Sequence, residues 1–73
     1  MTESNATTIA RIYDRLSNKI IFDPPEDDRR LARLQLGLWK LTLAYSAALV
    51  EDHLEMDFLL LEASDMIREA RAA

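Results

Sequence analysis

The chain has 73 residues, a formal net charge of −4 and an apolar content of 49%, with no cysteine, one glycine and two prolines. This composition excludes a disulfide-stapled scaffold, a cysteine zinc site, a collagen-like repeat and a disordered linker. The length lies near the limit for a self-sufficient core, because the gain from apolar burial and the loss of conformational entropy are each about 110 kcal/mol. We therefore expect the chain to need a partner.

The first predicted element is a short amphipathic helix over about 7–18, preceded by a polar, flexible tail at 1–6. The helix is indicated by one apolar stripe at helical spacing. The stripe consists of Ile9, Ile12, Tyr13, Leu16 and Ile20. We expect this helix to end at Ser17-Asn18, because these residue types favour turns. The β-branched and aromatic residues that follow predict an extended apolar strap at 19–23.

A second helical region is predicted over about 24–72. Its start is indicated by Asp23-Pro24-Pro25, with Asp23 as the N-cap and the prolines in the first turn, where no backbone N–H is needed. Acidic residues follow directly, and a helix N-terminus favours them.

Two models fit this helical region. Gly37 alone interrupts a run of helix formers, which favours one continuous helix that pairs with a second copy. The alternative is a helical hairpin that turns near 50–52, with Asp52 as N-cap and Glu55 completing a capping-box-like pair. A hairpin would place Lys40 opposite Glu62.

The charge positions favour the continuous helix in an antiparallel dimer, whose axis would pass between Ala47 and Ala48. Opposite charges then face each other across the two chains. The expected interchain ion pairs are Arg30 with Asp65, Arg33 with Glu62, and Lys40 with Glu55. Exposed pairs contribute only about 0–1 kcal/mol each, so they would set the register rather than create the dimer.

The dimer interface is predicted from an apolar stripe that steps by three and four residues. Its members are Leu31, Leu34, Leu38, Leu41, Tyr45, Ala48, Met56, Leu59, Ala63 and Met66. A second apolar set lies outside this stripe: Leu36, Trp39, Leu43, Val50, Leu54, Phe58 and Leu61. A helix that is apolar on most sides must be surrounded, so the first helix should cover part of this set and a second chain the rest. The predicted fold is therefore an all-α, antiparallel dimeric four-helix-like bundle.

No catalytic, cofactor or metal site is predicted. The chain lacks a glycine-rich phosphate loop and a cysteine nucleophile, and its one histidine has no triad-like context. His53 and Asp57 are neighbours on a helix, but Val50 occupies the position where a Glu-x-x-His metal motif needs glutamate. We interpret His53 as an ordinary surface residue, and we expect no enzymatic activity.

The predicted function is that of a small homo-oligomeric protein–protein interaction module: a regulator, adaptor or small chaperone of bacterial or phage type, in the cytoplasm. Residues 34–73 carry seven acids and three bases, which would steer a basic partner protein. Trp39 is the candidate partner anchor, because tryptophan is frequent at binding hot spots.

Two alternatives remain open. The first is a nucleic-acid-binding regulator, which the net acidity disfavours. Its basic patch would consist of Arg29, Arg30 and Arg33, with Arg11, Arg15 and Lys19. The second is a structural subunit of a larger particle. A membrane protein is not expected, because the most apolar window, 36–50, is shorter than a span and contains Lys40.

Overall fold

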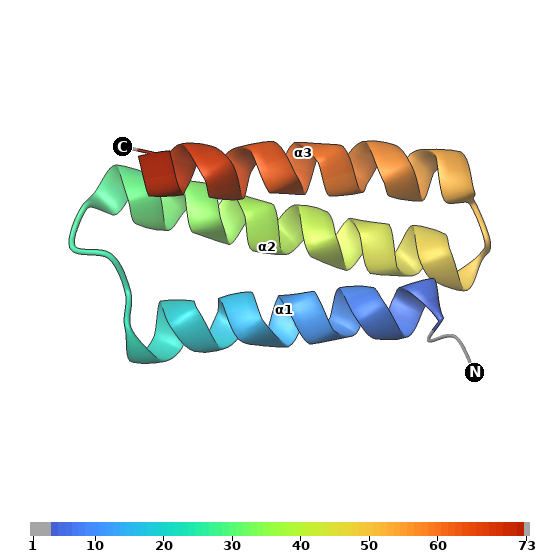
Figure 1. The fold of residues 1–73 in the computed structure, drawn as a ribbon, viewed down its shortest axis with the longest axis horizontal. Helices are drawn as coiled ribbons and strands as arrows, with labels where there is room; N and C mark the ends of the chain where they lie inside the picture. The colour runs from blue at the N-terminus through green and yellow to red at the C-terminus, as the bar shows by residue number, and fades with distance from the viewer. Residues whose placement is uncertain (1–3, 73) are drawn as a thin grey trace.

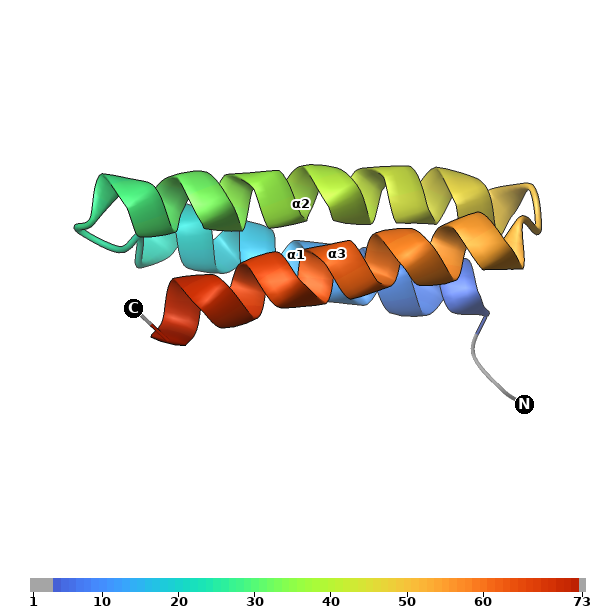
Figure 2. The ribbon, with the colours of Figure 1, turned by 90° about the horizontal axis from the view of Figure 1, so that it is seen from above.

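The computed structural model describes residues 4–72, and over this range it contains three α-helices and no strand. Helix α1 spans Asn5–Phe22, α2 spans Asp28–Leu49 and α3 spans His53–Ala72. Successive helices run antiparallel, and α2 lies in the middle and packs against both others (Figure 1). In the perpendicular view, α1 and α3 both lie on the same side of α2 (Figure 2). The all-α prediction is confirmed.

Helix α1 is longer at both ends than the sequence pattern predicted. Residues 1–3 of the predicted tail lie outside the described residues, and Ser4 is already the N-cap, with its hydroxyl accepting a hydrogen bond from the backbone N–H of Thr7 at 3.2 Å. At the other end, helix replaces the predicted strap, because Ile20 continues the apolar stripe and packs against the core. Packing of this kind overrides the weak local preference for an extended backbone.

The connection between α1 and α2 places the second N-cap later than predicted. Asp27, not Asp23, caps α2, and its carboxylate accepts a hydrogen bond from the backbone N–H of Arg29 at 2.8 Å. A proline disfavours helical geometry in the residue before it, so Pro24 cannot enter a helix ahead of Pro25. Both prolines therefore lie in the connection, where they keep α1 and α2 separate.

The region predicted to be either continuous helix or hairpin is a hairpin, with its turn at Val50, Glu51 and Asp52. The backbone N–H of Asp52 donates to the carbonyl oxygen of Ala47 at 2.9 Å, and that of Glu51 donates to Ala48 at 3.1 Å. This is the Schellman pattern of a helix C-terminus.

The second half of the turn starts the next helix. The Asp52 side chain accepts a hydrogen bond from the backbone N–H of Glu55 at 3.2 Å, and the first backbone bond of α3 joins Met56 to Asp52 at 3.0 Å. One half of the expected capping box is thus formed. The continuous helix is accordingly not the structure of this chain.

The hairpin buries much of the predicted dimer stripe within a single chain. The core consists of Ile9, Leu16, Leu34, Leu41, Ala44, Ala47, Met56, Leu59, Ala63 and Ala70. Five of these belong to the predicted interchain interface: Leu34, Leu41, Met56, Leu59 and Ala63. Leu38 and Ala48 of that interface pack against the core, whereas Tyr45 is 37% exposed. The stripe therefore has its partner in cis.

Ion pairs between α2 and α3 follow the hairpin register. Lys40 pairs with Glu62 at 3.4 Å, and Arg33 pairs with Glu69. The predicted interchain pairs, Arg30 with Asp65, Arg33 with Glu62 and Lys40 with Glu55, assumed continuous helices that cross near Ala47 and Ala48. With a chain reversal at 50–52, that crossing has no geometric basis.

Candidate interaction surfaces

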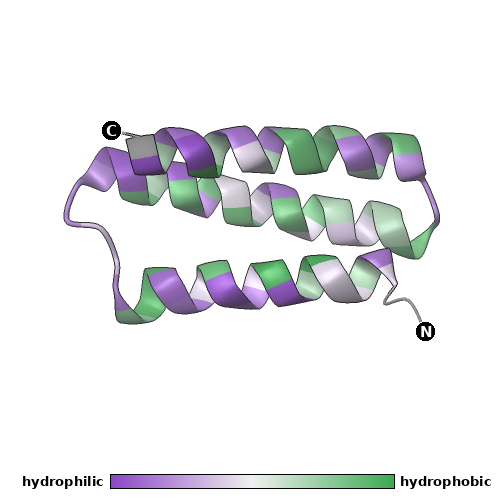
Figure 3. Cartoon of the chain, viewed as in Figure 1, coloured by the Kyte–Doolittle hydropathy of each residue, from purple (hydrophilic) through white to green (hydrophobic). Residues whose placement is uncertain are grey.

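One candidate surface is an exposed apolar face on the α2–α3 hairpin. We call it the outer apolar face and define it by five exposed residues, Leu36, Trp39, Leu54, Phe58 and Leu61, with the partly buried Leu43 at its edge. Trp39 is 55% exposed, Phe58 58% and Leu61 65%. Hydrophobic colour covers a long stretch of α3 in the half nearer the α2–α3 turn (Figure 3). Side chains of this size are normally removed from water.

The Lys40–Glu62 ion pair links the two halves of the outer apolar face. Residues three and four apart share a side of a helix. Leu36 and Leu43 therefore lie on the Lys40 side of α2, and Phe58 lies on the Glu62 side of α3. The Lys40 ammonium also lies 5.3 Å from the centre of the Trp39 ring, which is a cation–π contact.

Helix α1 does not cover this face, contrary to the sequence-based expectation. It packs on another side of α2, where Ile9 and Tyr13 border a small hollow with Leu41 and Tyr45. Helix α1 therefore does not bury the second apolar set, and the exposed members of this set remain in contact with solvent. Its most exposed members, Leu54 at 86% and Val50 at 75%, lie close to the α2–α3 turn.

The total surface of the chain is large for its mass. It exposes 5390 Å², whereas a compact monomer of 8.4 kDa is expected to expose about 4,600 Å². The excess is about 800 Å², which equals the area that one partner buries in a standard protein–protein interface.

The acidic second half divides into a paired and an unpaired part. Glu62, Asp65 and Glu69 each have a basic partner within α2 or α3. Across 51–57 the acids are exposed, and Asp52 is used as the helix cap. Negative charge available to a partner is therefore concentrated around the turn rather than spread along α3.

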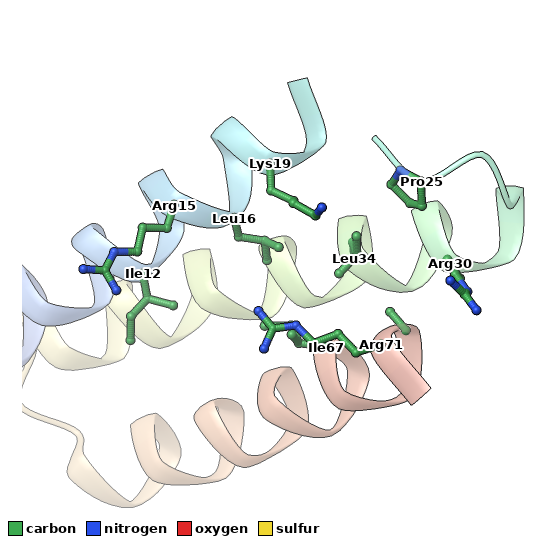
Figure 4. A pocket seen from close by; sticks show the side chains of 10 residues that line it. Ile12, Arg15, Leu16, Lys19, Pro25, Arg30, Leu34, Ile67 and Arg71 are labelled. Atoms are coloured by element: carbon green, nitrogen blue, oxygen red, sulfur yellow. The ribbon is translucent and has the colours of Figure 1, made fainter. Parts of the chain in front are cut away.

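A second candidate surface is an opening between α1 and α3, which we call the basic groove (Figure 4). Over the described helices, α1 and α3 each pack on α2 but make no close backbone contact with each other. The groove has a volume of about 500 Å³. Its lining residues are Ile12, Arg15, Leu16, Lys19, Pro25, Arg30, Leu34, Ile67, Ala70 and Arg71.

The basic residues of the predicted nucleic-acid patch do not share one environment in the structure. Arg30 lines the basic groove, whereas Arg33 turns toward Glu69 of α3. Arg15 and Lys19 join Arg30 in the groove, and they are joined there by Arg71, which the sequence did not single out. Nothing in the sequence links Arg71 to α1, because only the tertiary arrangement brings them together.

The residues weighed for metal binding and catalysis are dispersed. His53 is exposed at the first position of α3. Residues 4–72 contain no group of three histidine, aspartate or glutamate side chains placed to hold a metal ion. Within the same range, none of the helices combines the length and the apolar character needed to cross a membrane.

Comparisons with known proteins give no relationship. The sequence matches no protein-family model and has no significant match among curated proteins or solved structures.

Proposed function

We propose that the protein is a homodimeric protein–protein interaction module that self-associates through the outer apolar face. The observation that carries this proposal is the exposure of Trp39, Phe58 and Leu61 on one side of the hairpin, in a chain of only 73 residues. Patches of this kind on small proteins mark interaction sites.

A second copy is the occupant that we propose for the face. The chain as a whole exposes about 800 Å² more than a compact monomer, which is similar to one side of a standard interface, and a twofold axis brings identical patches together. Two hairpins packed face to face form a four-helix bundle, with α1 of each copy on the outside. This arrangement keeps the predicted assembly but replaces the two long helices by two hairpins.

The dimer has features of an adaptor or regulator for a basic partner protein. Aromatic anchors such as Trp39 and Phe58 provide most of the energy in many interfaces. The exposed acids at 51–57 lie beside the face, where they would accelerate encounter with a basic surface. Because Glu62, Asp65 and Glu69 are paired within the chain, this steering would originate at the α2–α3 turn and the first residues of α3.

Light scattering at tens of micromolar tests the proposal. We expect a mass twice that of the 8.4 kDa chain. Phe58→Glu places a charge in the outer apolar face and should give a monomer that keeps its helical circular dichroism spectrum. Phe22→Glu is the matched control, because Phe22 is 80% exposed at the end of α1, outside the face. It should remain a dimer.

Two results would contradict the proposed dimer. A monodisperse wild-type monomer at this concentration would overturn the proposal. So would a Phe58→Glu dimer, because the interface would then lie elsewhere. Growth beyond a dimer with concentration would instead support a structural subunit of a larger particle.

A further inference from the structure

The basic groove has a charge opposite to that of the whole chain. The protein has thirteen acids and nine bases, yet the described lining of the groove contains four bases and no acid. Lys19 and Arg71 reach into the opening from α1 and α3, and Arg30 stands at its end on α2 (Figure 4). Three separate helices thus contribute cations to the lining of one groove.

Most of these cations lack an internal counterion. Within residues 4–72, Lys19 is the only one of the four with an ion pair, to the exposed carboxylate of Asp23 at 2.9 Å. The Nε atom of Arg30 is buried and has no hydrogen-bond partner among residues 4–72. A buried donor without a partner is unfavourable, and neighbouring like charges repel each other. An anion in the groove would offset the repulsion among the cations, and a guanidinium binds carboxylate or phosphate through two parallel hydrogen bonds.

The floor of the groove is apolar and continues beyond the cations. Leu16 and Leu34 lie at its base, and Ile12 and Ile67 line the opening from α1 and α3. An adjoining hollow, also of about 500 Å³, shares Ile12, Ile67 and Arg71 and extends toward Leu41 and Leu60. A free inorganic anion would leave this apolar surface in water, and a nucleic acid strand would need cations along an extended surface.

We propose that the basic groove binds a single-chain amphipathic anion, with a carboxylate or phosphate headgroup at Arg30, Lys19 and Arg71 and an apolar chain along the α1–α3 opening toward Leu41 and Leu60. The volume lies within the range of small-molecule sites, which combine an apolar lining with a few converging polar groups. This site is separate from the outer apolar face, so the inference does not depend on the dimer.

Isothermal titration calorimetry below the micellar concentration tests the site with four probes: decanoate, decyl phosphate, decanol and inorganic phosphate. We expect saturable binding of decanoate, decyl phosphate or both, with one site per chain. Stronger binding of decanoate assigns a carboxylate headgroup, and stronger binding of decyl phosphate assigns a phosphate. Decanol and inorganic phosphate should each bind at least tenfold more weakly, because each lacks one half of the amphiphile.

Charge-neutralising variants locate the site. Arg30→Gln combined with Arg71→Gln should weaken binding roughly tenfold or more. Arg29→Gln is the matched control, because Arg29 precedes Arg30 on α2 and does not line the groove. It should change the dissociation constant by less than about twofold. The monomeric Phe58→Glu variant should bind as the wild type does.

Several results would overturn the inference. These are the absence of binding by both anionic amphiphiles, equal binding of decanol, equal binding of inorganic phosphate, and a double variant with unchanged affinity. Loss of binding in Phe58→Glu alone would place the amphiphile on the outer apolar face. An acidic amphipathic peptide that binds the groove while both amphiphiles fail would assign the site to a helical partner instead.

Discussion

Glu51 has a backbone φ of 59°, the left-handed conformation that side chains other than glycine rarely adopt. It occupies the position after the α2 C-cap, where glycine is most common. The residue is exposed, so its side chain gains little from packing. The turn is therefore formed in spite of an unfavourable residue, because the reversal brings α3 back onto α2.

Glu51→Gly should raise the free energy of unfolding by up to about 1 kcal/mol, because removal of the strain exceeds the added flexibility of the unfolded chain. Urea denaturation followed by circular dichroism measures the change. Glu55→Gly is the control, because Glu55 lies in the first turn of α3. This variant should lower the free energy of unfolding by up to about 1 kcal/mol, since glycine disfavours a helix. Equal losses at both positions would mean that residue 51 is helical, as in the continuous-helix model.

Asp27, the N-cap of α2, is a second residue whose side chain stabilises the fold. Asp27→Ala should lower the free energy of unfolding by about 1 kcal/mol, because the N–H of Arg29 loses its acceptor. Asp23→Ala removes only an exposed ion pair with Lys19 and should have a smaller effect. A larger loss of unfolding free energy in Asp23→Ala than in Asp27→Ala, measured by urea denaturation, would mean that Asp23 is the N-cap of α2.

The helices show which parts of the fold are readable from the sequence. The stripe from Ile9 to Ile20 predicted α1, but the turn preference of Ser17-Asn18 placed its end too early, because the end of the helix at Phe22 depends on packing. Asp52 and Glu55 carried a correct signal for the hairpin. The interchain charge match was misleading, because exposed pairs of about 0–1 kcal/mol cannot outweigh burial of a whole apolar stripe in cis.

Helices α2 and α3 approach closely at Gly37. A Cβ atom placed there would lie 3.2 Å from Cγ1 of Ile67 and 3.6 Å from the carbonyl oxygen of Ala63. The first separation is tight and the second is an ordinary contact. A single methyl group therefore requires a small shift of Ile67, whereas a branched side chain requires the helices to separate.

Gly37→Val should therefore lower the free energy of unfolding by about 1–3 kcal/mol through overpacking. Thermal and urea denaturation measure the effect. Ala32→Val is the control, because residue 32 is exposed on α2 and tests only the helix preference of valine. Similar small effects in both variants would show that α2 and α3 are farther apart than described.

In the whole molecule, the outer apolar face can be predicted from the sequence, whereas the basic groove cannot. The outer apolar face follows from helical spacing, since Leu36 and Trp39 lie outside the stripe that packs in cis. The basic groove does not, because Arg30 and Arg71 meet only through the opening between α1 and α3. Periodicity reports the faces of one helix, whereas a groove between helices depends on how they pack.

A homodimer that closes the outer apolar face makes stability depend on concentration. Association stabilises the folded state by mass action, so a hundredfold rise in concentration adds about 2.7 kcal/mol per dimer. For chains of this size, the thermal midpoint should rise by about 5–10 °C. Circular dichroism melts at about 1 and 100 μM would measure this shift. Phe58→Glu should melt at one temperature throughout, because its outer apolar face cannot close, whereas Phe22→Glu should follow the wild type. An equal thermal midpoint of the wild type at both concentrations would contradict the dimer, because a single chain would then be stable with Trp39 and Phe58 exposed to water.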